Sequence, residues 1–327
     1  MKKIIAEIGS SHDGSFGNAE KLILAAKDCK ADIIKFQLHL PEYEMLPTAP
    51  SPSFFKSENR FDYFKRTNFN IDQLKHLKRI TEKLKMQFMV SPFSEKALEM
   101  LETIDLEYYK VASGEVTNHK LLEKLKKTGK KIFMSTGMSN WKEIDKGFKI
   151  LNKKKTVLMQ CSSIYPCPAN IVGLNVINEL KKRYRTTVGF SDHYLGLEAG
   201  FAAAALGAEV IEKHITFSRK MYGSDAPNAM EIDEFKKYVS GIRSIWTMNE
   251  NPVDKNNIKV YKDTKRIFEK SIIINKNLSK NHKIELEDLA FKKPGDGISA
   301  MDYKSVIGRR LKHSINENTK LKMKDLC

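Results

Sequence analysis

Short runs of β-branched and aromatic residues alternate with amphipathic stretches from residue 4 to about residue 250, and no other feature of the sequence constrains the fold as strongly. This alternation is typical of repeated βαβ units and therefore of a parallel sheet. The stretch 70–85 opens with the helix-capping residue Asn70 and carries its apolar residues on one face, so we expect a helix there. The predicted strands are 4–9, 33–37, 87–90, 108–113, 131–135, 156–161, 187–191 and 209–214.

Eight strands separated by helices predict closure into a (β/α)8, or TIM, barrel. Such a barrel takes roughly 250 residues, so a chain of 327 residues has room for a barrel and a small appendage. An open doubly wound sheet is the alternative α/β architecture, but no G-x-G-x-x-G follows the first predicted strand. We therefore predict an α/β fold with a TIM-barrel domain at residues 1–250.

The apolar periodicity lapses between residues 249 and 265, where Asn, Lys and Asp dominate. We place a linker at 251–268 and a second, β-rich domain at 269–327, because short strand-like runs and Pro/Gly turns follow the linker. A module of this size lies near the lower limit for independent stability, so we expect it to dock on another surface.

The segment 41–69 is long for a barrel loop and is rich in proline and in aromatic residues such as Phe54 and Phe55. It follows the second predicted strand, so it would lie over the end of the barrel where active sites are found. Long loops in compact domains are usually functional. The segment is therefore either a lid over the site or a structural insertion.

The formal net charge of +17 raises the alternative of a basic, non-enzymatic nucleic-acid-binding protein. The lysines are, however, spread among glutamates along helix-like stretches, which is the pattern of solvated helix faces, and the surplus charge would also attract an anionic substrate. No apolar run approaches the ~20 residues of a membrane span, and Glu7 interrupts the first apolar run too early for a signal peptide. We therefore expect a cytoplasmic protein with no membrane partner, and the dispersed lysines predict no nucleic-acid partner. The four cysteines form no C-x-x-C pair, so we expect reduced thiols.

Polar residues recur at the carboxyl ends of the predicted strands, where β/α-barrel enzymes carry their catalytic groups. A structural barrel would not concentrate such residues at one end of so many strands. The residues are Glu7, Lys35, Gln37, Ser91, Lys110, Ser113, Glu115, Ser135, Ser162, Ser163, Ser191, His193 and His214.

His193 and His214 end the seventh and eighth predicted strands, which are neighbours in a closed barrel. Two imidazoles facing a common point form half of a metal site; the alternative is a pair of hydrogen-bonded core histidines. A site with open positions suits a Lewis-acid ion such as Mn²⁺ or Mg²⁺ better than structural zinc, and such an ion would polarise a carbonyl group.

Lys35 and Lys110 lie inside otherwise apolar strands, where an unpaired ammonium is costly and needs an anionic partner. Together with the strand-end serines they would suit a phosphate group. The alternative is a structural pair between Lys35 and Glu7. Glu7 and Glu115 could transfer protons or anchor sugar hydroxyls, and their spacing does not choose between these roles.

Several motifs agree in order and spacing with one family over the whole barrel. The sequence resembles the N-acetylneuraminate (sialic acid) synthase family, including its legionaminate and pseudaminate branches, and the tail from about residue 270 resembles the antifreeze-like (SAF) domain of these enzymes. The motifs are Ile5-Ala6-Glu7-Ile8-Gly9, Lys35-Phe36-Gln37, Ser91-Pro92-Phe93-Ser94, Lys110-Val111-Ala112-Ser113-Gly114-Glu115, Ser135-Thr136-Gly137-Met138, Tyr165-Pro166, Gly189-Phe190-Ser191-Asp192-His193 and Glu212-Lys213-His214.

The resemblance implies a transferase that forms a C–C bond between phosphoenolpyruvate (PEP) and N-acetylmannosamine or a related N-acylated amino-hexose, releasing phosphate. It implies manganese, with magnesium or cobalt as alternatives, on His193 and His214, and a domain-swapped homodimer. Glu7 stands where the family keeps a carboxylate beside these groups. The PEP-binding residues implied are Lys35, Ser91, Lys110, Ser113, Ser135, Ser163 and Ser191, and the sugar-binding residues are Gln37, Glu115, Tyr165, Asp225 and Lys293.

The chain departs from the family pattern at two positions. Ser162-Ser163 stands where some members have Thr-Asn, and Lys293 stands where the family usually has arginine, which binds in a bidentate way that lysine cannot. A synthase of 3-deoxy sugar acids that uses a phosphorylated aldose is the neighbouring alternative. The C-terminal domain and Ser191-Asp192-His193 favour the sialic-acid branch over it.

Overall fold

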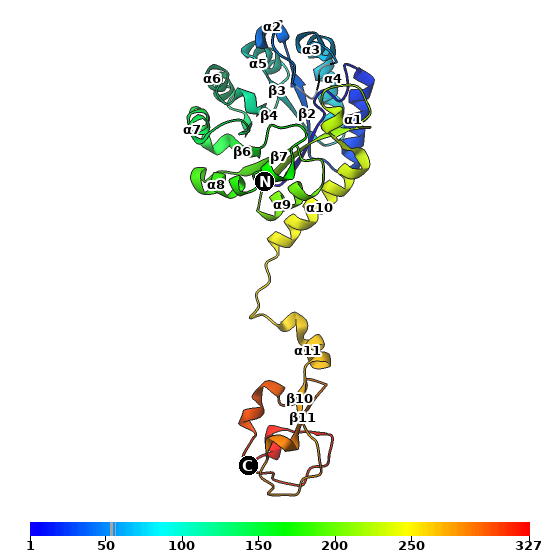
Figure 1. The fold of residues 1–327 in the computed structure, drawn as a ribbon, viewed down its shortest axis with the longest axis vertical. Helices are drawn as coiled ribbons and strands as arrows, with labels where there is room; N and C mark the ends of the chain where they lie inside the picture. Colours follow the sequence, from blue (N-terminus) through cyan, green and yellow to red (C-terminus); the bar gives the residue numbers. More distant parts are fainter. Residues whose placement is uncertain (53–54, 56) are drawn as a thin grey trace. The chain divides into compact units, whose positions relative to one another are not determined.

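The computed structural model describes residues 1–52, 55 and 57–327 (Figure 1). Ser53, Phe54 and Lys56, which fall in the predicted lid segment, lie outside the described residues. The chain divides into two compact units, Met1–Asn251 and Pro252–Cys327, and each unit has its own buried apolar core.

Among the described residues, the first unit contains a closed barrel of eight parallel strands, as the sequence predicted. Each strand pairs with the next along the chain, and β1 pairs with β8 to close the barrel, with Glu7 opposite His214. A short strand, β9 (Met230–Glu231), pairs in parallel with the end of β8. The barrel strands are β1 (Lys3–Glu7), β2 (Ile33–Leu38), β3 (Gln87–Pro92), β4 (Tyr108–Val111), β5 (Lys131–Ser135), β6 (Thr156–Cys161), β7 (Val188–Asp192) and β8 (Val210–Thr216).

Two strands end earlier than expected. The first was predicted to reach residue 9, but Gly9 adopts φ +51°, which leaves the extended conformation. The fourth was predicted to reach residue 113, but Ser113 begins a 3₁₀ turn in which the Glu115 N–H donates to Ala112 O at 2.9 Å. Both departures occur where the chain leaves the barrel toward the predicted site.

Helices form the layer outside the barrel (Figure 1). The helix expected at 70–85 is α4, and it opens with a capping box in which Asn70 and Gln73 each accept the other's backbone N–H at 2.9 Å. The helices are α1 (Phe16–Asp28), α2 (Pro41–Glu44), α3 (Arg60–Thr67), α4 (Ile71–Lys83), α5 (Glu95–Glu102), α6 (His119–Lys127), α7 (Trp141–Ile150), α8 (Asn175–Tyr184), α9 (Glu198–Ala205) and α10 (Ile232–Glu250).

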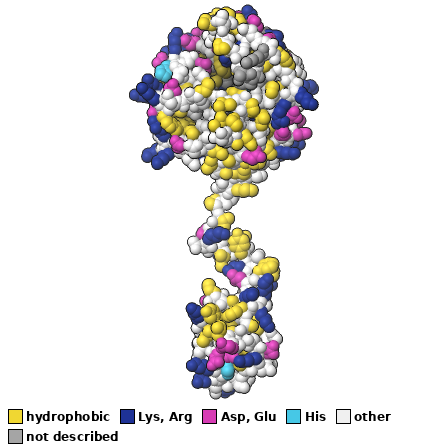
Figure 2. Space-filling model, viewed as in Figure 1, with side chains coloured by type: hydrophobic (Ala, Val, Ile, Leu, Met, Phe, Trp, Pro, Cys, Tyr) yellow, Lys and Arg dark blue, Asp and Glu magenta, His cyan; other side chains and the backbone are white. Residues whose placement is uncertain are grey.

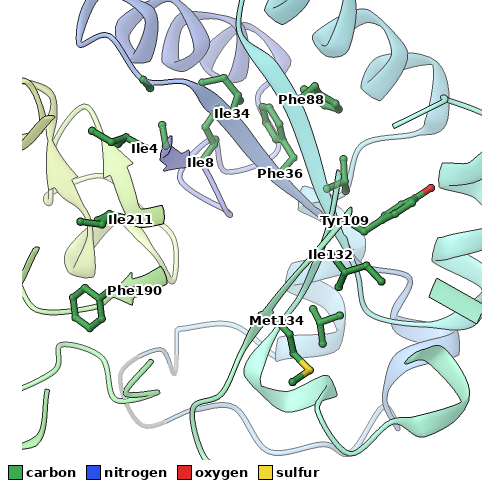
Figure 3. Packing of buried hydrophobic residues seen from close by; sticks show 14 of the residues in the cluster. Ile4, Ile8, Ile34, Phe36, Phe88, Tyr109, Ile132, Met134, Phe190 and Ile211 are labelled. Atoms are coloured by element: carbon green, nitrogen blue, oxygen red, sulfur yellow. The ribbon is translucent and has the colours of Figure 1, made fainter. Parts of the chain in front are cut away.

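Alternate residues of each strand face opposite sides of the barrel wall. Outward residues such as Ile34, Phe36 and Phe88 pack with the surrounding helices in the main core (Figure 3). Inward residues such as Met89 and Phe133 form a separate apolar layer inside the barrel. The same two-residue period places the next inward positions, toward the carboxyl ends of the strands, in the predicted site.

The second unit contains a small antiparallel sheet, and most of its residues lie in turns, loops and short 3₁₀ helices. Strands β10 (Ser271–Ile274), β11 (Leu289–Lys292) and β12 (Thr319–Lys320) form an antiparallel sheet in the order β11-β10-β12. Its core includes Ile272, Ile274 and Leu311, each fully buried. The stretch expected to be a linker contains the short helix α11 (Lys262–Phe268).

The distribution of surface charge differs from that of a single basic patch. Figure 2 shows Lys and Arg side chains dispersed over the visible face and interspersed with Asp and Glu. In the described part of the chain, we find no helix with the length and apolar character that a membrane crossing requires.

Candidate active site

The carboxyl ends of the barrel strands meet in one cavity of about 640 Å³. The strand-end side chains reach it because they continue the inward-facing positions of the barrel. Part of the cavity wall comes from the segment after β2, including Glu44, Phe55, Arg60 and Phe64. The sequence-predicted site residues that line the cavity are Lys35, Gln37, Ser91, Lys110, Ser113, Glu115, Ser135, Ser163, Tyr165, Ser191, His193, His214 and Asp225.

Two residues of the predicted site, Glu7 and Lys293, do not line this cavity. Glu7 is fully buried and contacts Lys35 and Gln37, which line the cavity. Lys293 belongs to the second unit, where its ammonium lies 5.0 Å from the centroid of the Phe268 ring.

The two buried lysines share one carboxylate that sequence reasoning had not assigned. Glu212 Oε1 lies 3.0 Å from Lys35 Nζ and 3.5 Å from Lys110 Nζ, and it accepts a hydrogen bond from Ser191 Oγ at 2.9 Å. Lys35 also lies 3.2 Å from Glu7 Oε2, so the structural pair considered from the sequence is present within this larger cluster. Glu212 is two residues before His214 on β8, so both side chains face the inside of the barrel. This two-residue spacing could have identified Glu212 as a site residue from the sequence.

Burial and charge set the protonation of this cluster in opposite directions. Burial alone would raise the pKa of Glu212, but Lys110 and Lys35 outweigh it and hold that pKa well below its ordinary range. Burial lowers the pKa of Lys110, whereas Glu212 and Glu7 outweigh burial at Lys35 and raise its pKa. Burial raises the pKa of Glu7 to about 7, against the opposing effect of Lys35. Glu7 can therefore exchange a proton near neutral pH.

Ser91 carries a buried hydroxyl that has no hydrogen-bond partner among the described residues. Its side chain is 1% exposed and lines the cavity beside Lys35. A buried polar group without a partner is costly, so its hydroxyl is available to a ligand. Lys110 Nζ, by contrast, donates to Ser135 Oγ at 2.6 Å, which places a second hydroxyl at the same anion-binding surface.

The two histidines lie side by side, with ring centroids 5.6 Å apart. His193 Nδ1 donates to the Ser162 carbonyl oxygen at 3.0 Å, which leaves its Nε2 lone pair available. His214 Nδ1 is buried and has no hydrogen-bond partner among the described residues, and burial lowers the pKa of this ring to about 4. The His214 ring is therefore neutral and presents a nitrogen lone pair of the kind that binds a metal ion. Burial alone would lower the pKa of His193, but Cys161 and the Ser162 carbonyl outweigh it and raise that pKa, so this ring must lose a proton before it binds a metal ion.

The donor set fits an ion that keeps open coordination positions. Within the described residues, no group of three or more His, Cys, Asp and Glu side chains is arranged around a common point, so the protein would supply only part of the coordination shell. Closed structural zinc sites need four protein ligands. The two histidines instead suit an ion that also binds water or substrate oxygen.

Carboxylates also line the outer part of the cavity. Burial raises the pKa of Glu115, whose Oε2 accepts a hydrogen bond from the Asn118 side chain at 2.8 Å. Asp225 accepts the Ser10 N–H at 2.7 Å and lies 3.8 Å from His214 Nδ1. This approach requires glycine at position 9, because a Cβ there would lie 2.2 Å from Asp225 Oδ2.

Sequence reasoning also missed two cavity residues, Cys161 and His39. Cys161 ends β6 and its sulfur lies 3.8 Å from His193 Nδ1; although burial raises the pKa of a thiol, His193, Ser113 and Lys110 lower that of Cys161 to about 6. Cys161 could have been predicted from the sequence, because alternate residues of β6 face the inside of the barrel. His39 follows β2 and lies between aromatic rings from segments distant in sequence, which no local pattern indicates.

A parallel β/α barrel with a buried, lysine-rich polar site at the carboxyl ends of its strands defines a barrel enzyme that acts on an anionic substrate. The sequence comparisons define the family. The model of the NeuB family matches residues 22–254, and the model of the SAF domain matches residues 269–326. The chain therefore belongs to the NeuB family.

Curated relatives and a solved structure extend this result. The N,N'-diacetyllegionaminic acid synthase of Campylobacter jejuni is 33% identical over 327 residues, covering 94% of this chain and 96% of the relative. The human N-acetylneuraminate-9-phosphate synthase is 33% identical over 249 residues, covering 74% of this chain and 69% of the relative. The crystal structure of N-acetylneuraminic acid synthetase from Leptospira borgpetersenii in complex with citrate is 30% identical, with a TM-score of 0.72, and the match covers 81% of this chain and 92% of that one.

Proposed function

We propose that the protein condenses phosphoenolpyruvate with an N-acylated amino-hexose to form a nonulosonic acid of the sialic-acid type, with release of phosphate. One observation carries the proposal: the Lys35–Glu212–Lys110 cluster, the Ser91 hydroxyl and the two histidines lie in a single cavity, and that hydroxyl has no hydrogen-bond partner among the described residues. The names of the two curated relatives described above, both synthases of such acids, support the same reaction.

The phosphate and carboxylate of PEP would bind at the buried lysines. Lys35 and Lys110 supply two ammonium groups, and the hydroxyls of Ser91, Ser113, Ser135, Ser163 and Ser191 surround them. Glu212 holds both lysines in place through contacts of 3.0 and 3.5 Å. Binding and orientation of the two substrates would supply most of the rate enhancement, because PEP already provides the chemical driving force.

In the proposed reaction, C3 of PEP forms a bond to C1 of the open-chain sugar, water adds at C2 of PEP, and the C2–O bond to phosphate breaks. Glu7, with its pKa raised to about 7, would give a proton to the sugar oxygen and take one from the water. Gln37, Glu115, Tyr165 and Asp225 would hold the sugar. A divalent ion on His193 and His214, Mn²⁺ first, would supply Lewis-acid polarisation of the aldehyde.

A phosphate-release assay tests this function. The protein is given PEP and Mn²⁺ with N-acetylmannosamine, its 6-phosphate, or the diacetamido-trideoxyhexoses of the legionaminate and pseudaminate routes. We expect release that depends on PEP and on one of these sugars. Release only with a phosphorylated aldose that lacks an acylamino group would assign the protein to the 3-deoxy sugar acid synthases, and no release with any sugar would refute the proposal.

The metal proposal has a test that does not depend on turnover. His193→Ala and His214→Ala should each abolish Mn²⁺ binding, measured by electron paramagnetic resonance of the free ion, without loss of folded structure. His76→Ala is the matched control, because His76 is half-exposed on α4 and pairs with Glu20 outside the cavity. Retained Mn²⁺ affinity in both cavity variants would remove the metal from these residues.

We further propose a domain-swapped homodimer in which the partner subunit's Lys293 contacts the sugar. The SAF match and the exposed apolar residues near it, including Val260 at 80% and Phe268 at 62% exposure, support burial against another surface. The Lys293→Ala and His214→Ala proteins are mixed and allowed to exchange subunits. Activity should then be restored, because each mixed dimer holds one intact site. Inactive mixtures, or a monomer in light scattering, would contradict the swap. Lys293→Arg should keep activity.

We also propose that the enzyme works in the cytoplasm. Cys29, Cys161 and Cys167 are buried free thiols, which is typical of proteins from reducing compartments. Cell fractionation with an antibody to the protein would test this location.

A further inference from the structure

His39 lines the cavity beside Gln37 and occupies an unusual position. It follows β2 directly and is 6% exposed. Its ring is stacked between Phe64 of α3, at a centroid distance of 3.8 Å and an angle of 9°, and Phe93 after β3, at 4.0 Å and 22°. The two phenyl rings prevent the imidazole from tilting and leave only its edges for polar contacts.

Both edges of the imidazole face oxygen atoms. Nδ1 lies 2.8 Å from Glu44 Oε2 on α2, and Nε2 lies 2.9 Å from Gln37 Oε1. The Gln37 amide oxygen accepts a hydrogen bond, so Nε2 donates to it. The Glu44 carboxylate, whose side chain is 7% exposed, holds the ring from the Nδ1 side.

The contact with His39 fixes the orientation of the Gln37 amide. Gln37 Nε2 donates to Glu7 Oε1 at 2.7 Å on its other side. Rotating the amide by half a turn would place its NH₂ group against the His39 N–H and its oxygen against the Glu7 carboxylate, and both contacts would be lost. The row Glu44–His39–Gln37–Glu7 therefore joins α2, in the segment over the cavity, to the buried carboxylate of the proton-transfer step.

We propose that His39 is a positioning residue for the sugar substrate: held by Phe64, Phe93 and Glu44, it locks the Gln37 amide in the orientation that binds the sugar. This inference rests on the proposed function, in which Gln37 contacts the sugar. It assigns His39 no contact with the reacting atoms. At the PEP end of the cavity Lys35 also contacts Glu7, but Glu212 holds both Lys35 and Lys110, so PEP binding should depend on His39 much less than sugar binding does.

The test is a double-mutant cycle read in Michaelis constants. His39→Ala should raise KM for the sugar about tenfold, while KM for PEP changes by less than about twofold, because one hydrogen bond that orients the sugar contact is lost. Gln37→Ala should raise the sugar KM by at least as much, and adding His39→Ala to it should have little further effect, since the two residues act through one amide. His76→Ala is again the control and should leave all constants unchanged.

Each outcome separates this proposal from the proposed function. If wild-type protein releases phosphate with PEP and an acylamino sugar, but His39→Ala raises both KM values equally or adds fully to Gln37→Ala, only the positioning role is wrong. If wild-type protein releases no phosphate, both proposals are wrong. Should His39→Ala not fold, Glu44→Ala replaces it, because it removes the oxygen that holds the ring at Nδ1. A rise in the sugar KM alone then supports the proposal, whereas an unchanged sugar KM or an equal rise for PEP overturns it.

Discussion

Replacing Lys213 by methionine removes the cation from a buried network directly behind the two histidines. Lys213 Nζ lies 3.0 Å from Asp192 Oδ2, and both side chains are at most 1% exposed. Asp192 also accepts hydrogen bonds from Tyr238 Oη of α10 at 2.6 Å and from the Tyr194 N–H at 2.9 Å. Because Asp192 and Lys213 precede His193 and His214, this pair ties together the ends of β7 and β8 that carry them.

The size of the effect follows from what Asp192 loses and what it keeps. Removing one partner of a buried ion pair costs about 3–5 kcal/mol, because the other charge stays buried. Asp192 keeps two donors, so we expect the lower end, about 3 kcal/mol of the free energy of unfolding. In a unit of this size, Met1–Asn251, each kcal/mol lowers Tm by about 2–4 °C, which gives a decrease of about 6–12 °C.

Tryptophan fluorescence during urea unfolding measures this change in the barrel unit alone. The chain has two tryptophans, Trp141 and Trp246, and both lie in the barrel unit. Lys220→Met, at an exposed position after β8, is the control and should change stability by less than about 0.5 kcal/mol. Adding Asp192→Asn to Lys213→Met should recover part of the loss, because no charge is then left unpaired. A loss below about 1 kcal/mol, or a double variant as unstable as the sum of the singles, would refute the reasoning.

Three further outcomes are expected. Ser91→Ala should raise KM for PEP about tenfold without loss of stability, because the hydroxyl it removes is buried and has no partner in the described residues; unchanged kinetics would contradict a phosphate at this point. Gly137→Ala would place a Cβ 2.2 Å from Ser163 Oγ and 2.8 Å from Ser113 Oγ, so kcat/KM for PEP should fall about tenfold or more, measured by phosphate release. In the second unit, burial alone would raise the pKa of Asp288, but Lys276, the Glu285 N–H and His282 outweigh it and lower that pKa. The stabilising effect of the Asp288 carboxylate is therefore present above the ordinary Asp pKa and is lost as the pH falls through the lowered value. Amide hydrogen exchange at Ile272 should show Asp288→Asn to be destabilising by about 1–3 kcal/mol at pH 7, with the difference shrinking in acid.

The fold was readable from the sequence because a β/α barrel repeats one local pattern. Each strand alternates inward and outward residues, so a polar residue on the inward phase near a carboxyl end predicts a site residue without knowledge of its neighbours. Lys35, Ser91 and Ser191 were found in this way. The strand limits were less accurate where the backbone leaves the sheet, as at Gly9, which has a positive φ and lies close to Asp225, a residue distant in sequence.

The sequence alone determined the barrel, the end of it that carries the chemistry, and most of the residue types gathered there. Only the tertiary structure decided how those residues are paired. Glu212 holds Lys35 across 177 positions of chain because barrel closure brings β8 beside β1, and His39 is fixed by rings from α3 and from the turn after β3. Periodicity follows from local backbone geometry, whereas these contacts require the closed barrel, and no local pattern encodes them.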